Sequence, residues 1–156
     1  MKKVLPIFII LLSSCGAFQI KYTPVSVDPV SKDLTIDKKS NELFVIANEW
    51  MIDRFNNPES VIEYTDKEEG ILAGKYLFHR ITGVGMNDVP AAATNLFAVI
   101  KIQVKDGATR ITISPQTYNN VDSPYIKKYT KEMALADINL IIENYIDYVK
   151  NYNDEF

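Results

Sequence analysis

Alternation of apolar and polar residues is clearest between residues 96 and 105, where every even-numbered side chain is apolar. The alternation resumes over residues 109–114, and Asp106-Gly107 lies just before it. Period-two alternation predicts strands with one covered face and one less covered face. Asp-Gly is a frequent tight-turn pair, so the two runs predict a β-hairpin.

Helical spacing of apolar residues marks two longer segments, residues 40–55 and 130–151. In each, large apolar side chains recur every three or four positions, which predicts an amphipathic helix. Ser40 is the expected N-cap of the first helix. Trp50 lies on its apolar stripe, so we expect this side chain in the core rather than in a binding site.

Shorter apolar runs predict three further strands, at residues 34–37, 61–65 and 71–81. A polar turn at residues 66–70, with Gly70 available for positive φ, joins the last two as a hairpin. Residues 82–95 are predicted as a long connection and residues 115–124 as turns. The order β-α-β-β-β-β-α predicts an α+β domain: an antiparallel sheet of about four to five strands with two helices on one face.

The first fifteen residues carry a more specific signal. Lys2 and Lys3 precede the nine-residue apolar run VLPIFIILL, which is too short to span a bilayer but has the length of a signal-peptide core. The run ends in Leu-Ser-Ser-Cys, which resembles the lipobox of bacterial lipoproteins. We therefore expect lipid on the thiol of Cys15. The alternative is a lone buried cysteine, a common fate of free thiols.

The lipobox sets the expected organisation of the chain. Residues 1–14 are the predicted signal peptide, residues 15–32 the lipidated cysteine and a tether, residues 33–152 the domain, and residues 153–156 a frayed tail. The position after the cysteine is a glycine and not an acidic sorting residue. We therefore expect attachment to the outer membrane through the lipid, with the domain facing the periplasm.

Composition narrows the classes of function. Hydrophobic residues make up 47% and charged residues 24%, which is typical of a globular domain. The formal net charge of −3 argues against a nucleic-acid partner, which needs a basic footprint. A single cysteine excludes an internal disulfide and a cysteine-based zinc cluster, and a single histidine excludes any site that needs two. We expect no metal and no cofactor.

Several motifs together resemble one known family. They are the helix with Trp50 and Phe55, the segment Val61-Ile62, the hairpin Glu69–Lys75, and Val104–Gly107 followed by Arg110. The chain is similar over about residues 33–150 to small secreted or lipid-anchored proteins of unknown function, mostly from Bacteroidota, described as having a TATA-binding-protein-like fold. Ala108-Thr109 departs from the family pattern, which often has an aromatic residue there. The resemblance implies that fold but no activity, cofactor or catalytic residue.

In such a fold the helices cover one sheet face and leave the other for partners. The candidate ligand face consists of polar and aromatic residues from the two clearest strands: Phe97, Lys101, Gln103, Arg110 and Thr112. Two cations, an amide and an aromatic ring suit an acidic, carbohydrate or peptide ligand, or another protein. The alternative is an ordinary solvated face with cross-strand pairs.

Other candidates are fewer. Met86, Asn87 and Asp88 lie near the tip of the long connection and form a candidate binding loop. His79 lies on a predicted strand without the motif of a nucleophile or partner, so we expect no catalytic residue. The chain is therefore predicted to be a non-catalytic binding or scaffolding module of the envelope. An envelope hydrolase or an accessory subunit of an enzyme complex is the alternative, and a structural spacer is the third possibility.

Overall fold

A computed structural model of the protein describes residues 21–56, 60–84, 90–122 and 126–152. These residues form strands and helices in the order β1 (Tyr22–Val25), β2 (Val30–Thr35), α1 (Ser40–Arg54), β3 (Val61–Asp66), β4 (Ile71–Val84), β5 (Pro90–Lys105), β6 (Ala108–Pro115), β7 (Tyr118–Val121) and α2 (Lys131–Asn151).

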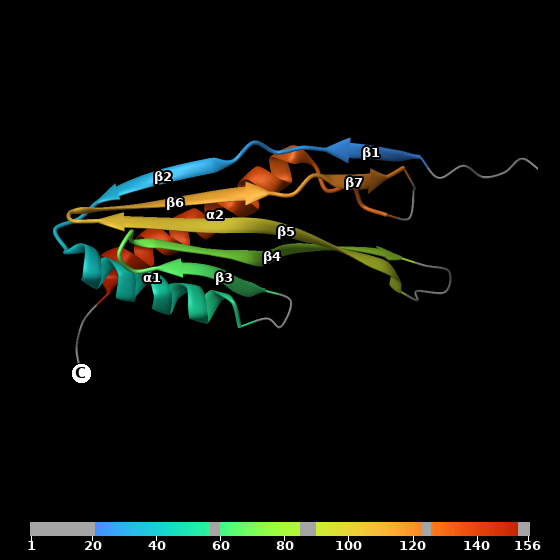
Figure 1. Ribbon diagram of the computed structural model, residues 1–156. Helices are drawn as coiled ribbons and strands as arrows, with labels where there is room; N and C mark the ends of the chain where they lie inside the picture. Colours follow the sequence, from blue (N-terminus) through green and yellow to red (C-terminus); the bar gives the residue numbers. More distant parts are fainter. Residues whose placement is uncertain (1–20, 57–59, 85–89, 123–125, 153–156) are drawn as a thin grey trace, which may run out of the picture.

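The main sheet is antiparallel, with the strand order β2-β6-β5-β4-β3. Strands β1 and β7 form a separate antiparallel pair, which continues from the end of β2 and β6 (Figure 1). Both helices lie on one face of the main sheet, and the opposite face is not covered by a helix (Figure 1). The α+β class and the antiparallel sheet with two helices on one face are confirmed. The small second sheet was not predicted.

The core lies between the helices and the sheet. The even-numbered side chains of β5, predicted to be covered, are buried from Leu96 to Val104. Trp50 of α1 is buried as predicted, and its ring meets the Tyr145 ring of α2 edge to face at 5.0 Å. The Trp50 indole N–H donates to Asn144 Oδ1 at 3.0 Å, which satisfies its one polar group. The apolar stripes of the two helices therefore meet each other as well as the sheet.

The start of α1 differs from the prediction in its capping. The helix begins at Ser40, but Lys39 occupies the N-cap position without a side-chain cap. The Ser40 backbone N–H donates instead to Asp106 Oδ1 at 2.8 Å, and this hydrogen bond lowers the pKa of Asp106. A residue of the β5–β6 turn thus replaces the local cap, which sequence spacing alone does not reveal.

The prediction of a long connection over residues 82–95 is wrong. β4 continues to Val84 and β5 begins at Pro90, and the two strands pair as far as Val84↔Pro90. The register of β4 shifts between Leu77 and His79 and again between Ile81 and Gly83. Each bulge reverses the alternation of side chains, so the period-two pattern that would mark the strand is lost in the sequence.

The tether expected over residues 15–32 overlaps two strands. Strand β1, Tyr22–Val25, pairs with β7, and β7 itself lies in the segment 115–124 that was predicted as turns. Strand β2 begins at Val30, earlier than the strand predicted at residues 34–37. Val27, between the two strands, is only 5% exposed. Pro24 is tolerated because β1 lies at the edge of its sheet. The packed part of the chain therefore starts before the predicted boundary at residue 33.

The β3–β4 turn follows the prediction closely. Asp66 Oδ1 accepts hydrogen bonds from the backbone N–H groups of Glu68 and Glu69, both at 3.0 Å. Gly70 has a φ of 65°, the left-handed conformation that glycine adopts without strain. The acidic residues here close a turn, as expected from their spacing.

Candidate functional site

All five residues of the candidate ligand face lie on the helix-free side of the main sheet. Strand alternation places them there, because the even-numbered side chains from Leu96 to Val104 of β5 are buried on the helix side. The β6 residues opposite Ile100, Ile102 and Val104 are buried with them. Lys101 of β5 lies directly opposite Thr112 of β6, and Gln103 lies opposite Arg110. Phe97 lies further along the same side of β5. The structure therefore brings the predicted residues onto one face.

Two of these side chains are engaged by β2. Arg110 Nε lies 2.5 Å from Asp33 Oδ1 and Nη2 lies 2.8 Å from Oδ2, a bidentate ion pair at an exposed position. Arg110 donates these hydrogen bonds and thereby lowers the pKa of Asp33. The hydroxyls of Thr112 and Ser31 lie 2.8 Å apart. These contacts join β2 to β6, so the charge of Arg110 is already compensated within the face.

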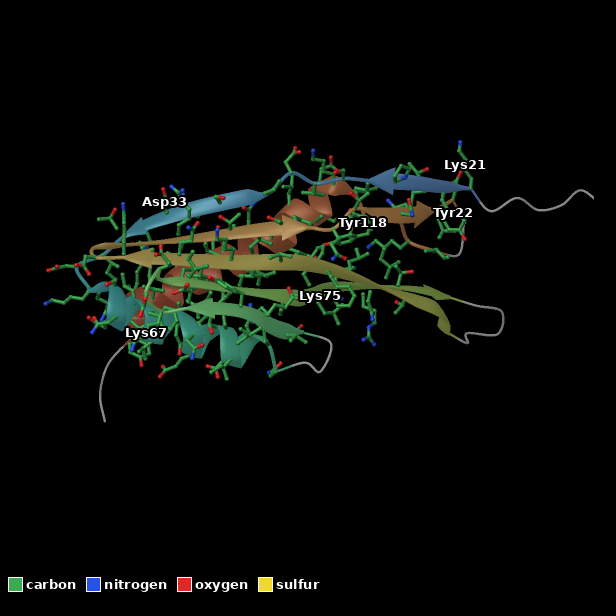
Figure 2. The ribbon with its side chains drawn as sticks, in the orientation of Figure 1. Lys21, Tyr22, Asp33, Lys67, Lys75 and Tyr118 are labelled. Atoms are coloured by element: carbon green, nitrogen blue, oxygen red, sulfur yellow. The ribbon has the colours of Figure 1, made fainter. Side chains whose placement is uncertain are left out.

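Phe97 has a cationic neighbour that the sequence did not indicate. Lys75 of β4 lies opposite Val99, and its Nζ lies 4.0 Å from the centroid of the Phe97 ring. A cation at this distance over an aromatic face is attracted by the ring quadrupole. Figure 2 shows Lys75 near the middle of β4 and Asp33 on β2. Only the strand register brings residues 75 and 97 together, so spacing along the chain gave no signal.

Apolar residues of β3 extend the same face. Val61 lies opposite Lys75, and Tyr64 lies opposite Ala73. Val61 is 52% exposed and Tyr64 is 51% exposed. The Tyr64 hydroxyl donates to Asp66 Oδ2 at 3.1 Å, and this contact raises the pKa of Tyr64. Large apolar side chains left open beside lysines are typical of a surface that contacts another molecule.

A shallow cavity lies on this face near the β5–β6 turn. Its volume is about 350 Å³, and its walls include Asp33, Gln103, Lys105 and Arg110. Gln103 supplies an amide donor and acceptor, and Lys105 supplies a cation. We call the helix-free face with Val61, Tyr64, Lys75, Phe97 and Lys101 the docking face.

His79 lies in a different place, on the side of the sheet that faces α2. Its ring is stacked on the Tyr129 ring, with centroids 3.9 Å apart and planes at 15°. His79 Nδ1 lies 3.3 Å from Asp137 Oδ2, and the Tyr129 hydroxyl donates to the same oxygen at 2.5 Å. Burial, and then this hydrogen bond to the carboxylate, raise the pKa of Tyr129. Sequence reasoning missed Tyr129 and Asp137, which come from the loop before α2 and from α2 itself.

Some predicted features cannot be compared with the structure. Cys15 and the candidate binding loop Met86, Asn87 and Asp88 lie outside the described residues. Within the described ranges, no group of three or more His, Cys, Asp or Glu side chains is placed to hold a metal ion. No helix in the described part of the chain is long and apolar enough to cross a membrane.

The sheet with one covered and one open face defines the class: an α+β domain with a TATA-binding-protein (TBP)-like fold. The chain belongs to the family described as a domain of unknown function (DUF4468) with TBP-like fold, which matches residues 32–119. The resemblance inferred from the sequence is therefore confirmed.

The solved structures that are similar to this chain include two of the same fold. A DUF4468 family protein from Bacteroides ovatus is 14% identical, with a TM-score of 0.54 over 82% of this chain and 88% of the other. A TBP-like protein from Parabacteroides distasonis is 16% identical, with a TM-score of 0.53 over 80% of this chain and 94% of the other. At these identities the likeness shows the fold alone. No curated protein matches the chain.

Proposed function

We propose that this protein is a lipid-anchored, non-catalytic binding module of the bacterial envelope that holds a partner on the docking face. The observation that carries the proposal is the open apolar surface of Val61 and Tyr64 beside Lys75 and Lys101 on a face without a helix. An exposed surface of this kind suits a partner protein or a small envelope ligand with apolar and acidic groups.

Charge supports an acidic partner. Asp33 is held by Arg110, and the Lys75 ammonium lies over an aromatic ring instead of against a carboxylate. Within the described residues, neither Lys75 nor Lys101 forms an ion pair. The protein as a whole carries a formal net charge of −3, so this surface differs from the average of the chain. Such a local potential steers an acidic partner to one face.

The anchor in this proposal is Cys15, in the sequence Leu-Ser-Ser-Cys that follows the apolar run. The lipobox pattern is itself that of bacterial lipoproteins, which supports a bacterial source. Several acyl chains on one residue would hold the domain at a membrane surface, which we propose is the periplasmic side of the outer membrane. Replacing Cys15 with serine should move the protein from the detergent phase to the aqueous phase; unchanged partition would contradict the anchor.

Native mass spectrometry of the full protein, extracted from its own envelope in mild detergent, tests the binding role. We expect a lipidated species with a bound partner, and we expect the variant Lys101→Glu to lose that partner. Lys150→Glu, a charge reversal in the last turn of α2, is the matched control and should retain it. A protein that carries nothing, or equal loss in both variants, would contradict binding on the docking face.

One observation favours the alternative function, an envelope hydrolase or an accessory subunit. His79 Nδ1 lies 3.3 Å from Asp137 Oδ2, an arrangement in which a carboxylate orients an imidazole. Under that alternative, His79→Ala should abolish an activity while Lys101→Glu should leave it unchanged. A binding module predicts the opposite sensitivity, because the docking face lies across the sheet from His79.

A further inference from the structure

A basic pocket lies on the helix side of the sheet, where the second half of β4 meets the loop before α2. Its volume is about 320 Å³. Its walls include the basic residues His79, Arg80, Lys127 and Lys128, and no acidic residue is among the described residues that line it. The whole chain has 20 acidic and 17 basic residues, so this composition is not the average of the surface. Carboxylates contact two of these groups, Asp137 at His79 and Asp122 at Lys128. A local excess of positive charge still concentrates anions.

The contacts of His79 fix the orientation of its ring. Stacking on Tyr129 holds the ring plane, and the approach of Nδ1 to Asp137 holds its rotation. Because the two ring nitrogens lie on different edges of the imidazole, Nε2 is turned away from the carboxylate. A ring held in this way presents Nε2 as a preoriented donor or acceptor.

The lysines of the pocket differ in their surroundings. Lys128 Nζ lies 2.9 Å from Asp122 Oδ1, so its charge is partly compensated. Lys127 makes no ion pair within the part of the chain that the structure describes. It is exposed at the pocket wall, so its ammonium is available to an incoming anion.

Two further features fit an anion with an apolar part. The pocket adjoins the first turn of α2, which begins at Lys131, and the positive end of a helix dipole favours negative charge nearby. Tyr129 and Met133 give the same pocket an aromatic wall and a thioether wall. Apolar walls with a few polar groups are typical of small-molecule sites.

We propose that this pocket binds a compact oxyanion, the phosphate or carboxylate group of a small molecule, between Lys127 and His79. The group has two possible sources, a free solute or the headgroup of an anionic lipid. This inference is independent of the proposed function, because the pocket and the docking face lie on opposite sides of the sheet.

His79 is the only histidine in the sequence, so its imidazole resonances in an NMR spectrum are unambiguous. The full protein in mild detergent is titrated with inorganic phosphate and with acetate, at constant pH and ionic strength. We expect a saturable shift of the His79 ring signals with at least one of the anions. We expect Lys127→Ala to weaken that binding about three- to fivefold, the effect of one exposed charge. Lys150→Ala, at an exposed position in the last turn of α2, is the matched control and should bind the anions as the unchanged protein does.

A second titration uses vesicles of phosphatidylglycerol and vesicles of phosphatidylcholine. Binding to the first alone, weakened by Lys127→Ala, assigns the oxyanion to a lipid headgroup. A saturable response to phosphate or acetate without a response to vesicles assigns it to a free solute. The proposal is overturned if neither titration gives a saturable shift, or if Lys127→Ala and Lys150→Ala respond alike.

Discussion

Thr109 and Tyr145 bury their hydroxyls together between the sheet and α2. The two oxygens lie 2.6 Å apart, and both residues are almost fully buried. Burial raises the pKa of Tyr145 to about 12, because the charged phenolate would lose its hydration. A buried polar pair is stabilising only while both partners are present.

Removal of the Tyr145 hydroxyl should therefore lower the stability of the folded protein. Tyr145→Phe removes the shorter of the two hydrogen bonds of the buried Thr109 hydroxyl and leaves only the one it donates to the Gln103 carbonyl oxygen at 3.4 Å. We expect a loss of about 1–2 kcal/mol in the free energy of unfolding. Urea denaturation at pH 8 measures it. The double variant Tyr145→Phe/Thr109→Val removes both polar groups and should cost less than the sum of the single changes. Additive losses would show that the hydrogen bond contributes little.

The same tyrosine predicts a response to alkaline pH. The pKa of Tyr145 is about 12 in the folded protein, whereas the ordinary value for a tyrosine, which applies to the unfolded chain, is 10.0. As the pH rises, the unfolded chain therefore releases this proton at a lower pH than the folded protein does. The stability contributed by the neutral side chain is complete below pH 10 and is lost as the pH rises from 10 through 12. Tyr145→Phe should lose less stability than the unchanged protein between urea titrations at pH 9 and pH 11.5. Equal losses in the two proteins would contradict a buried neutral Tyr145.

At the scale of elements, Gly74 allows α1, β3 and β4 to pack closely. A Cβ at this position would lie 2.6 Å from Phe55 Cε1 and 2.7 Å from the Val61 carbonyl oxygen. The second neighbour is backbone and cannot rotate away, so the strands would have to separate. Glycine is therefore required here by a close approach and not by its backbone angles.

Gly74→Ala should destabilise the protein by about 1–3 kcal/mol, the usual cost of overpacking. The midpoint of urea unfolding measures the change. Ala73→Ser is the matched control, because Ala73 faces the helix-free side of the same strand. A midpoint for Gly74→Ala equal to that of the control would contradict the close packing of β3 on β4.

The β1–β7 pair gives a second prediction at this scale. A chain that begins at Ser31 loses β1 and the buried Val27, whose burial alone is worth about 1.5–3 kcal/mol. We expect its urea midpoint to be lower than that of a chain that begins at Lys21. Tyr118 of β7, which donates to the Tyr129 carbonyl at 3.0 Å, should become more exposed. Equal midpoints would mean that β1 contributes nothing to stability.

The elements that sequence patterns predicted well are those with local, uninterrupted periodicity. The alternation from Leu96 to Val104 and the stripe around Trp50 depend only on which face of one element is buried. The bulge between Ile81 and Gly83 interrupts that periodicity at the end of the predicted strand, so the extension of β4 to Val84 was missed. β7 was missed because it is short and its partner strand starts at Tyr22, almost a hundred residues earlier.

In the candidate site, too, local periodicity predicted some features, whereas contacts between distant strands were missed. Alternation alone placed Phe97, Lys101 and Gln103 on the open side of β5, because side-chain direction follows from strand parity. The contact of Lys75 with Phe97 depends on strand register, and the ion pair of Arg110 with Asp33 depends on β2 lying beside β6. Non-local pairing of this kind leaves no spacing signal in the sequence.

At the scale of the whole molecule, the two faces of the sheet have different environments. The helices cover one face and build the core, while the docking face remains open (Figure 1). Exposed apolar residues occur on both sides, since Leu140 on α2 is 63% exposed and Tyr64 on β3 is 51% exposed. Exposure of apolar side chains alone therefore does not distinguish a docking surface from the rest of the protein surface. Tyr64 and Leu140 are similarly exposed on opposite sides, so they serve as a test position and its matched control.

Site-specific photo-crosslinking in the native envelope tests the central claim most directly. The photoreactive residue p-benzoylphenylalanine replaces Tyr64 in one variant and Leu140 in another, and adducts are detected by mass after irradiation. The account predicts a discrete adduct from position 64 and none from position 140. Adducts of equal yield from both positions, or none from position 64, would contradict a partner on the docking face.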